Sequence, residues 1–183
     1  HMFYGEGSEE PLFYLRKMIM AGSREERKAA LDELYPHMKD DIRETLRAMA
    51  GLPVTIRLMD PPLHEFIPHE SKGQTQLAEA LGIDGTELAR RAEQLRETNP
   101  MMGHRGVRLG VTYPEITELQ AKAILTATAE LQAKDITVLP EIMVPLTAAE
   151  AEFTHQEQIV RRVAGEVEAA QNCKLNYLVG TMI

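Results

Sequence analysis

Apolar residues recur every three or four positions near the start of the chain, which predicts amphipathic helices. The first helix is expected over 9–22, with Gly22 as its end. Ser23 and Glu26 have the spacing of a capping box, in which each side chain accepts a hydrogen bond from the other residue's backbone N–H. We therefore expect a second helix from Ser23 to Gly51, with a kink near Pro36 because proline removes a backbone hydrogen bond.

Four further helices are predicted downstream by the same spacing. They are expected near 72–82, 84–98, 114–135 and 147–171. Asp84 and Thr147 carry side-chain oxygens suited to an N-cap, and Pro114 fits the first turn of a helix.

Three short apolar stretches, at 54–56, 136–146 and 175–180, predict strands. The first, a β-branched run, is expected to be buried. Runs that are apolar on both faces are typical of parallel strands covered by helices. The alternation of strands and helices predicts a parallel α/β fold, either an open doubly wound sheet or part of a (β/α)8 barrel. A closed barrel typically takes about 250 residues, so this chain has too few strands to close one.

The composition narrows the class of protein. A chain of 183 residues with 44% hydrophobic content favours a single domain over 1–183. Its net charge of −8 argues against a nucleic-acid partner. Cys173 is the single cysteine, which fits a reducing compartment, and the sequence has neither a signal peptide nor an apolar run of 18 residues. We expect a cytoplasmic protein without a membrane partner.

The segment after the first predicted strand is a candidate site. Arg57 ends that strand, and the Asp60-Pro61-Pro62 turn leads into a loop that carries His64 and Glu65. Polar residues at the carboxyl ends of parallel strands commonly bind ligands. The alternative is a structural ion pair between Arg57 and Asp60, and the residue pattern favours neither interpretation.

A second candidate segment has Arg105 and Arg108 among three glycines, at positions 103, 106 and 110. Glycines let the backbone approach a ligand or another chain segment closely, and two nearby guanidinium groups repel each other unless an anion lies beside them. The alternative is a glycine-rich turn with surface arginines. Both interpretations stay open.

Several motifs together resemble a known family. They are V-T-I-R-L-M-D-P-P-L-H-E-F (54–66), N-P-M-M-G-H-R-G-V-R-L-G-V-T-Y-P-E-I (99–116), P-E-I-M-V-P-L (140–146) and V-G-T-M-I (179–183). The chain resembles the phosphoenolpyruvate/pyruvate-binding domain of the pyruvate, phosphate dikinase family over essentially its whole length. D-P-P-L-H-E-F favours this family over phosphoenolpyruvate synthase and enzyme I of the sugar phosphotransferase system.

The resemblance implies a partial (β/α)8 TIM-type barrel, truncated at both ends, with helical insertions at 9–50 and 72–98. Phosphoenolpyruvate or pyruvate would bind at the carboxyl ends of the strands near Mg²⁺, with Arg57 and Arg105 facing the substrate oxygens. The family's phosphohistidine domain exchanges a phosphoryl group with pyruvate, and ATP and phosphate react at a third domain. The resemblance also implies a homodimer.

Five residues are expected in supporting roles: Asp60, His64, His104, Arg108 and Glu141. Arg108 would brace the loop, and Glu141 would pair with a guanidinium. The family's Mg²⁺ ligands and its catalytic cysteine would lie beyond Ile183, so we expect no metal ligand or catalytic residue within the chain. Cys173 matches no catalytic cysteine.

The leading hypothesis is therefore an internal piece of a pyruvate, phosphate dikinase, a phosphotransferase that interconverts ATP, pyruvate and phosphate with AMP, phosphoenolpyruvate and pyrophosphate. We expect the isolated piece to be inactive. The alternatives are one of the two related phosphoenolpyruvate-utilising enzymes, or a non-catalytic module for assembly or anion binding, because an unclosed barrel exposes strand edges.

Overall fold

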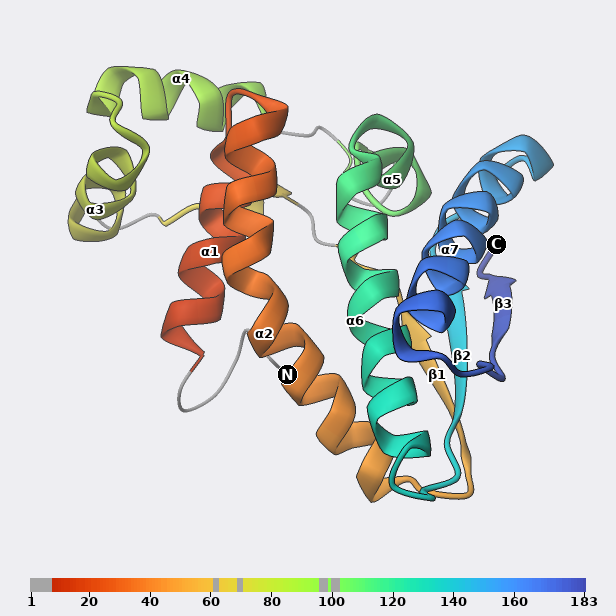
Figure 1. Cartoon of the computed structure of the whole chain (residues 1–183). Coiled ribbons are helices and arrows are strands. Elements are labelled where there is room, and N and C mark those ends of the chain that lie inside the picture. Colours follow the sequence, from red (N-terminus) through yellow and green to blue (C-terminus); the bar gives the residue numbers. More distant parts are fainter. Residues whose placement is uncertain (1–7, 61–62, 69–70, 96–98, 100–102) are drawn as a thin grey trace. The chain divides into compact units, whose positions relative to one another are not determined.

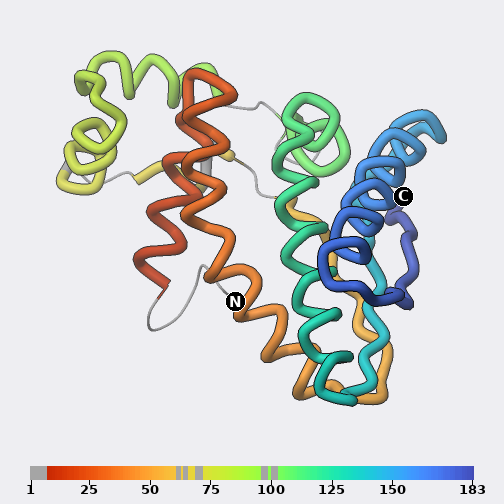
Figure 2. Tube along the Cα trace, in the orientation of Figure 1, coloured from red at the N-terminus to blue at the C-terminus, as the bar shows by residue number. Residues whose placement is uncertain are grey.

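A computed structural model describes residues 8–60, 63–68, 71–95, 99 and 103–183, apart from the side chains of His64, Glu65 and Ser71. The chain divides into two compact units. The helical unit contains 1–34 and 61–105, and the sheet unit contains 35–60 and 106–183. The chain leaves the sheet unit after Asp60 and returns to it at Gly106. Figure 2 traces the backbone from red at the N-terminus to blue at the C-terminus.

The sheet unit is built on three parallel strands in the order β1-β2-β3 (Figure 1). They are β1 (Pro53–Arg57), β2 (Leu139–Val144) and β3 (Leu178–Thr181). In the register, Arg57 lies opposite Met143, which in turn lies opposite Gly180. The predicted parallel α/β class is thus confirmed. The second and third strands are shorter than predicted, because only part of each apolar stretch pairs with its neighbour.

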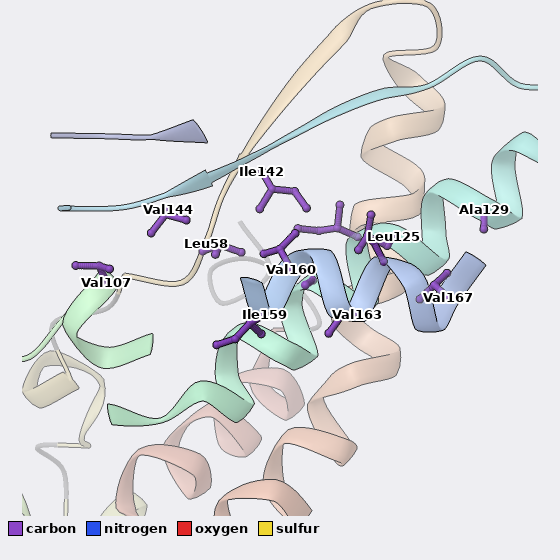
Figure 3. Packing of buried hydrophobic residues seen from close by; sticks show 13 residues of the cluster. Leu58, Val107, Leu125, Ala129, Ile142, Val144, Ile159, Val160, Val163 and Val167 are labelled. Carbon is purple, nitrogen blue, oxygen red and sulfur yellow. The ribbon is translucent and has the colours of Figure 1, made fainter. Parts of the chain in front are cut away.

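Two helices, α6 (Pro114–Gln132) and α7 (Glu150–Gln171), pack against one face of this sheet (Figure 1). Ile142 and Val144 of β2 point toward Leu125 of α6 and Val160 of α7 (Figure 3). All four side chains are essentially excluded from solvent. This apolar layer is the core of the sheet unit, and α6 starts at Pro114 as predicted.

The opposite face of the sheet is exposed along β1 and half-buried along β2. Along β1, Thr55 and Arg57 are exposed, whereas Val54 and Ile56, which face the helices, are half-buried. The prediction of a buried β1 is therefore wrong. The strand is β-branched and apolar enough for a covered position, but within the described part of the chain helices pack on one of its faces only.

A short helix, α5 (Val107–Thr112), was not predicted because six residues are too few to show a periodic pattern. Gly106 precedes it with a φ of +59°, a conformation that disfavours any residue with a side chain. A Cβ atom at Gly106 would lie 2.9 Å from the Pro145 carbonyl oxygen, and one at Gly110 would overlap Oε1 of Gln156. These two glycines thus allow close approach to other chain segments.

The helical unit contains α1 (Glu9–Met20), the first half of α2 (Arg24–Ala48), the 3-10 helix η1 (Leu63–Phe66), α3 (Ser71–Leu81) and α4 (Gly85–Gln94). Asp84 caps α4 as predicted, by accepting a hydrogen bond from the Glu87 backbone N–H at 2.7 Å. Hydrogen bonds from Arg90 and Arg91 lower the pKa of the Glu87 carboxyl group to about 2. The predicted end of α4 at Thr98 lies outside the described residues.

Two predicted caps differ from those observed. Ser23 accepts a hydrogen bond from the Glu26 N–H as expected, but the Glu26 carboxylate accepts one from Gly22 rather than from Ser23. Thr147 does not cap α7, which begins at Glu150; the Glu152 carboxylate caps that end by accepting from two backbone N–H groups.

The predicted insertion at 9–50 divides at Leu34, since the second half of α2 belongs to the sheet unit. The α2 helix continues through Pro36, and the kink stays a prediction.

Candidate functional site

Arg57 reaches the carboxyl end of β1 and forms an ion pair there. Its Nη2 contacts Oδ2 of Asp60. The Asp60 side chain is only 4% exposed, whereas 43% of the Arg57 side chain remains exposed. The pair foreseen as a structural alternative is therefore present, and it leaves much of the guanidinium group accessible to solvent.

Each of the three residues after Arg57 makes a contact of its own within the sheet unit. The Leu58 N–H donates to the Met143 carbonyl of β2 at 2.9 Å, and the Leu58 side chain is buried in the core. The Met59 N–H donates to Oε1 of Gln120 on α6 at 2.5 Å. Asp60 forms the ion pair with Arg57. This turn is therefore anchored to both the sheet and a helix.

Glu141 lies at the centre of the exposed sheet face. It stands opposite Thr55 in the β1–β2 register, and its Oε2 accepts a hydrogen bond from the Thr55 hydroxyl at 2.5 Å. A guanidinium partner for Glu141 stays a prediction. Glu141 comes two residues before Met143 on β2, so the two side chains lie on the same face of the sheet. Met143 in turn lies opposite Arg57.

The chain re-enters the sheet unit at Gly106, next to the carboxyl end of β2. The Val107 N–H donates to the Pro145 carbonyl at 2.9 Å, so Gly106 and α5 begin beside the end of this strand. Leu146 has a φ of +57°, which is strained for a residue with a Cβ atom. Backbone strain of this kind is found preferentially at functional sites, so the end of β2 is a candidate rim.

The arginines of the glycine-rich segment fall in different units. Arg105 is half-buried in the helical unit, and its backbone N–H donates to the Gly103 carbonyl at 3.0 Å. Arg108 lies on α5, and its buried Nε has no hydrogen-bond partner among the described residues. The bracing role of Arg108 and the convergence of Arg57 with Arg105 stay predictions.

The two candidate histidines lie in the helical unit. His104 is half-buried beside Arg105. His64 falls within η1, but its side chain lies outside the described residues, as do Pro61 and Pro62.

The Arg57 end of the site is suited to an anion. A partly exposed guanidinium group donates to phosphate and carboxylate oxygens in a planar fork. Within the described ranges, no group of three or more histidine, cysteine, aspartate or glutamate residues is arranged to hold a metal. Asp60 is engaged by Arg57, and Glu141 by Thr55.

Three buried polar side chains near the site were not predicted from the sequence. Gln120, Thr117 and Gln156 are each less than 10% exposed, and the Thr117 hydroxyl donates to Oε1 of Gln156 at 2.6 Å. A signal was available for Gln120. It lies four residues from both Ile116 and Ile124, and so on the buried face of α6.

Cys173 packs, half-buried, against the core of the sheet unit after α7. Among the helices of the described part, none is long and apolar enough to cross a membrane.

The chain matches a known protein family and several known proteins. Residues 9–183 match the family model described as "PEP-utilising enzyme, PEP-binding domain". The chain is 49% identical to pyruvate, phosphate dikinase 1 of Arabidopsis thaliana, 44% identical to pyruvate, phosphate dikinase 2 of Zea mays and 41% identical to pyruvate, phosphate dikinase of Clostridium symbiosum. Each match covers 100% of this chain but 19% to 21% of the relative. The chain thus spans about a fifth of the length of these relatives.

Proposed function

This chain belongs to the PEP-binding domain family of PEP-utilising enzymes, and we propose that it is the part of a pyruvate, phosphate dikinase that binds phosphoenolpyruvate or pyruvate. The full-length enzyme would interconvert ATP, pyruvate and phosphate with AMP, phosphoenolpyruvate and pyrophosphate. The substrate would bind at the carboxyl ends of β1 and β2, where parallel α/β proteins commonly bind ligands.

The observation that carries this proposal is the state of Arg57. It lies at the carboxyl end of β1, is fixed by the buried Asp60 carboxylate, and still exposes 43% of its side chain. What distinguishes Arg57 from the other partly exposed ion-pair arginines is its place at the carboxyl end of a parallel strand, where ligands commonly bind. A guanidinium group held at one nitrogen is oriented to bind an oxyanion with the others.

Arg105 is the second proposed ligand of the substrate. Consecutive Cα atoms are about 3.8 Å apart, so Arg105 must lie next to Gly106. Gly106 approaches the Pro145 carbonyl, two residues along the chain from Met143, which pairs with Arg57. That Arg105 binds the same substrate as Arg57 is part of the proposal and rests on the family resemblance of the G-H-R-G motif.

The proposed chemistry is electrostatic stabilisation. Phosphoryl transfer between phosphoenolpyruvate and a histidine develops charge on several oxygens at once. Two guanidinium groups on different loops would bind those oxygens, and their fixed positions would lower the cost of reorganisation in the transition state. Asp60 would orient Arg57, while His104, Arg108 and Glu141 would lie around the pocket.

The remaining parts of the enzyme are proposed from the family resemblance. Mg²⁺ would be held by ligands outside 1–183, and the phosphohistidine domain and ATP site would belong to the same full-length protein, a cytoplasmic homodimer. The exposed face of the β1-β2-β3 sheet is the face that a closed TIM-type barrel would turn inward. This architecture is part of the proposal.

A coupled assay tests the function. Pyruvate formation from phosphoenolpyruvate, AMP and pyrophosphate should occur with the full-length protein that carries this segment. The isolated chain of 183 residues should show no turnover. An inactive full-length protein, or an active isolated chain, would contradict the proposal.

The second candidate is a non-catalytic assembly module, favoured by the exposed edge of β3 and by Leu178, which is 63% exposed. Sedimentation at micromolar concentration distinguishes it. Concentration-dependent self-association of the isolated chain would favour the module, and a stable monomer would argue against it.

A further inference from the structure

Gln120 is a polar residue in an apolar environment. It lies on α6 between core residues and is 8% exposed. Burial of an amide group is unfavourable unless its hydrogen bonds are made inside the protein. The Gln120 side chain is satisfied at Oε1 by the Met59 backbone N–H, at 2.5 Å.

Met59 lies between two residues that are anchored by other means. Leu58 is held by β2 and by the core, and Asp60 is held by Arg57. Gln120 therefore supplies a hydrogen bond from a helix side chain to the backbone of this turn, and it fixes the peptide between the strand end and the buried carboxylate.

The space around this amide is too small for a ligand. Gln120, Thr117 and Gln156 line a cavity of about 10 Å³, together with apolar residues of the core. Such a volume holds about one water molecule and cannot accept phosphoenolpyruvate. The buried amide thus acts on the site through the turn and does not contact the substrate.

We infer that Gln120 is a positioning residue for Arg57. By holding Met59, it fixes the direction in which Asp60 approaches the guanidinium group, and so the direction in which Arg57 presents its remaining donors. This inference rests on the proposed function of Arg57. It extends that function to a buried residue 61 positions away from Met59.

The test compares three variants of the full-length protein that carries this segment. Gln120→Met keeps the length of the side chain but removes the acceptor, whereas Gln120→Glu keeps an acceptor oxygen. Gln158→Met is the control, because Gln158 is exposed on α7 of the same unit. Steady-state kinetics and hydrogen exchange of the Met59 amide are measured for each variant.

We expect Gln120→Met to accelerate exchange at Met59 and to lower kcat about tenfold, as the loss of one buried hydrogen bond predicts, with KM changed less than about twofold. Gln120→Glu should recover most of both losses, and Gln158→Met should match the wild type.

Unchanged exchange at Met59 in Gln120→Met would overturn the inference. So would faster exchange with an unchanged kcat, since a purely structural contact would lower stability without altering turnover by the folded enzyme. If the wild-type protein has no turnover, the proposed function fails, and the exchange data alone then decide whether Gln120 holds the turn.

Discussion

The two faces of the β1-β2-β3 sheet differ in almost every property. On the covered face, Ile142 and Val144 are 1% exposed and pack against α6 and α7. On the opposite face, Thr55 and Arg57 are exposed and Glu141 is half-buried and hydrogen-bonded. Successive residues of a strand point to opposite faces, so neighbours in the sequence have quite different environments.

The two faces contribute to different properties of the protein, one to its stability and the other to its chemistry. The covered face holds the unit together by excluding apolar surface from water. The exposed face carries the charged groups and ends at the rim where Arg57 is held. Substitutions on the covered face should therefore change mainly the free energy of unfolding, whereas substitutions at the rim of the exposed face should change mainly turnover.

The largest expected effect is on the covered face. Ile142→Ala should lower the free energy of unfolding of the chain by about 2–5 kcal/mol, because it removes a fully buried side chain and leaves a cavity. Met143→Ala is the matched control on the other face and should cost much less. Urea denaturation measures both, and equal losses would show that the two faces contribute alike.

At the rim, Arg57→Lys should leave stability nearly unchanged but lower kcat of the full-length protein. Loss of one planar donor fork in an electrostatically stabilised step costs on the order of 3 kcal/mol, which is about a hundredfold in rate. Arg47→Lys, on the exposed end of α2, is the control. A wild-type kcat for Arg57→Lys would remove Arg57 from the proposed site.

Replacement by alanine should change the stability of the chain in opposite directions at two glycines of the sheet unit. Gly110→Ala should destabilise the chain by about 1–3 kcal/mol, because its Cβ would overlap Oε1 of Gln156. Gly165→Ala, within α7, meets no atom within 4 Å and should stabilise by about 0.4–1 kcal/mol. Thermal unfolding of both variants decides the matter, and a shift of the same sign in both would refute the packing argument.

Much of the covered face could be predicted from the sequence, since its signals are local. The apolar stripe of α6 follows from residues within one or two turns, and so does the Asp84 cap of α4 in the helical unit. The exposure of β1 could not be predicted in this way. A β-branched apolar strand looks the same whether one face or both are covered, and the covering elements are distant in sequence.

The candidate site shows the same limit. Arg57 was found because a charge at the end of an apolar strand is a local anomaly, and its pairing with Asp60 spans three residues. The contact between Met59 and Gln120 spans 61 residues, so no local pattern reveals it. The six residues of α5 likewise depend on Gly106 meeting Pro145, which the sequence does not place together.

On the exposed face, Thr55→Val tests how much the Thr55–Glu141 pair contributes. Valine keeps the β-branched shape but loses the hydroxyl donor, so the expected loss is about 0.5–1.5 kcal/mol, the usual net value of one hydrogen bond. A double-mutant cycle with Glu141→Met, which removes the acceptor, isolates the pair from strand propensity. A coupling energy near zero would show that the pair adds nothing to this face.

The smallest expected effect lies outside the covered layer, where Glu130 of α6 contacts Lys39 and Arg43 of α2. Burial raises the pKa of the Glu130 carboxyl group, but the hydrogen bond and charge of Lys39, with those of Arg43, outweigh it and lower the pKa below 4.5. A carboxyl group with a lowered pKa stabilises the folded state fully above its unfolded value, and this contribution is lost as the pH falls through the folded value.

Glu130→Gln should therefore cost only a few tenths of a kcal/mol at pH 7, as partly exposed ion pairs do. The cost should vanish toward acid pH, because the wild-type carboxylate is then protonated. Melting curves of both proteins between pH 7 and pH 3 measure this difference. A gap that widens on acidification would mean that folding raises the pKa of this carboxyl group instead of lowering it.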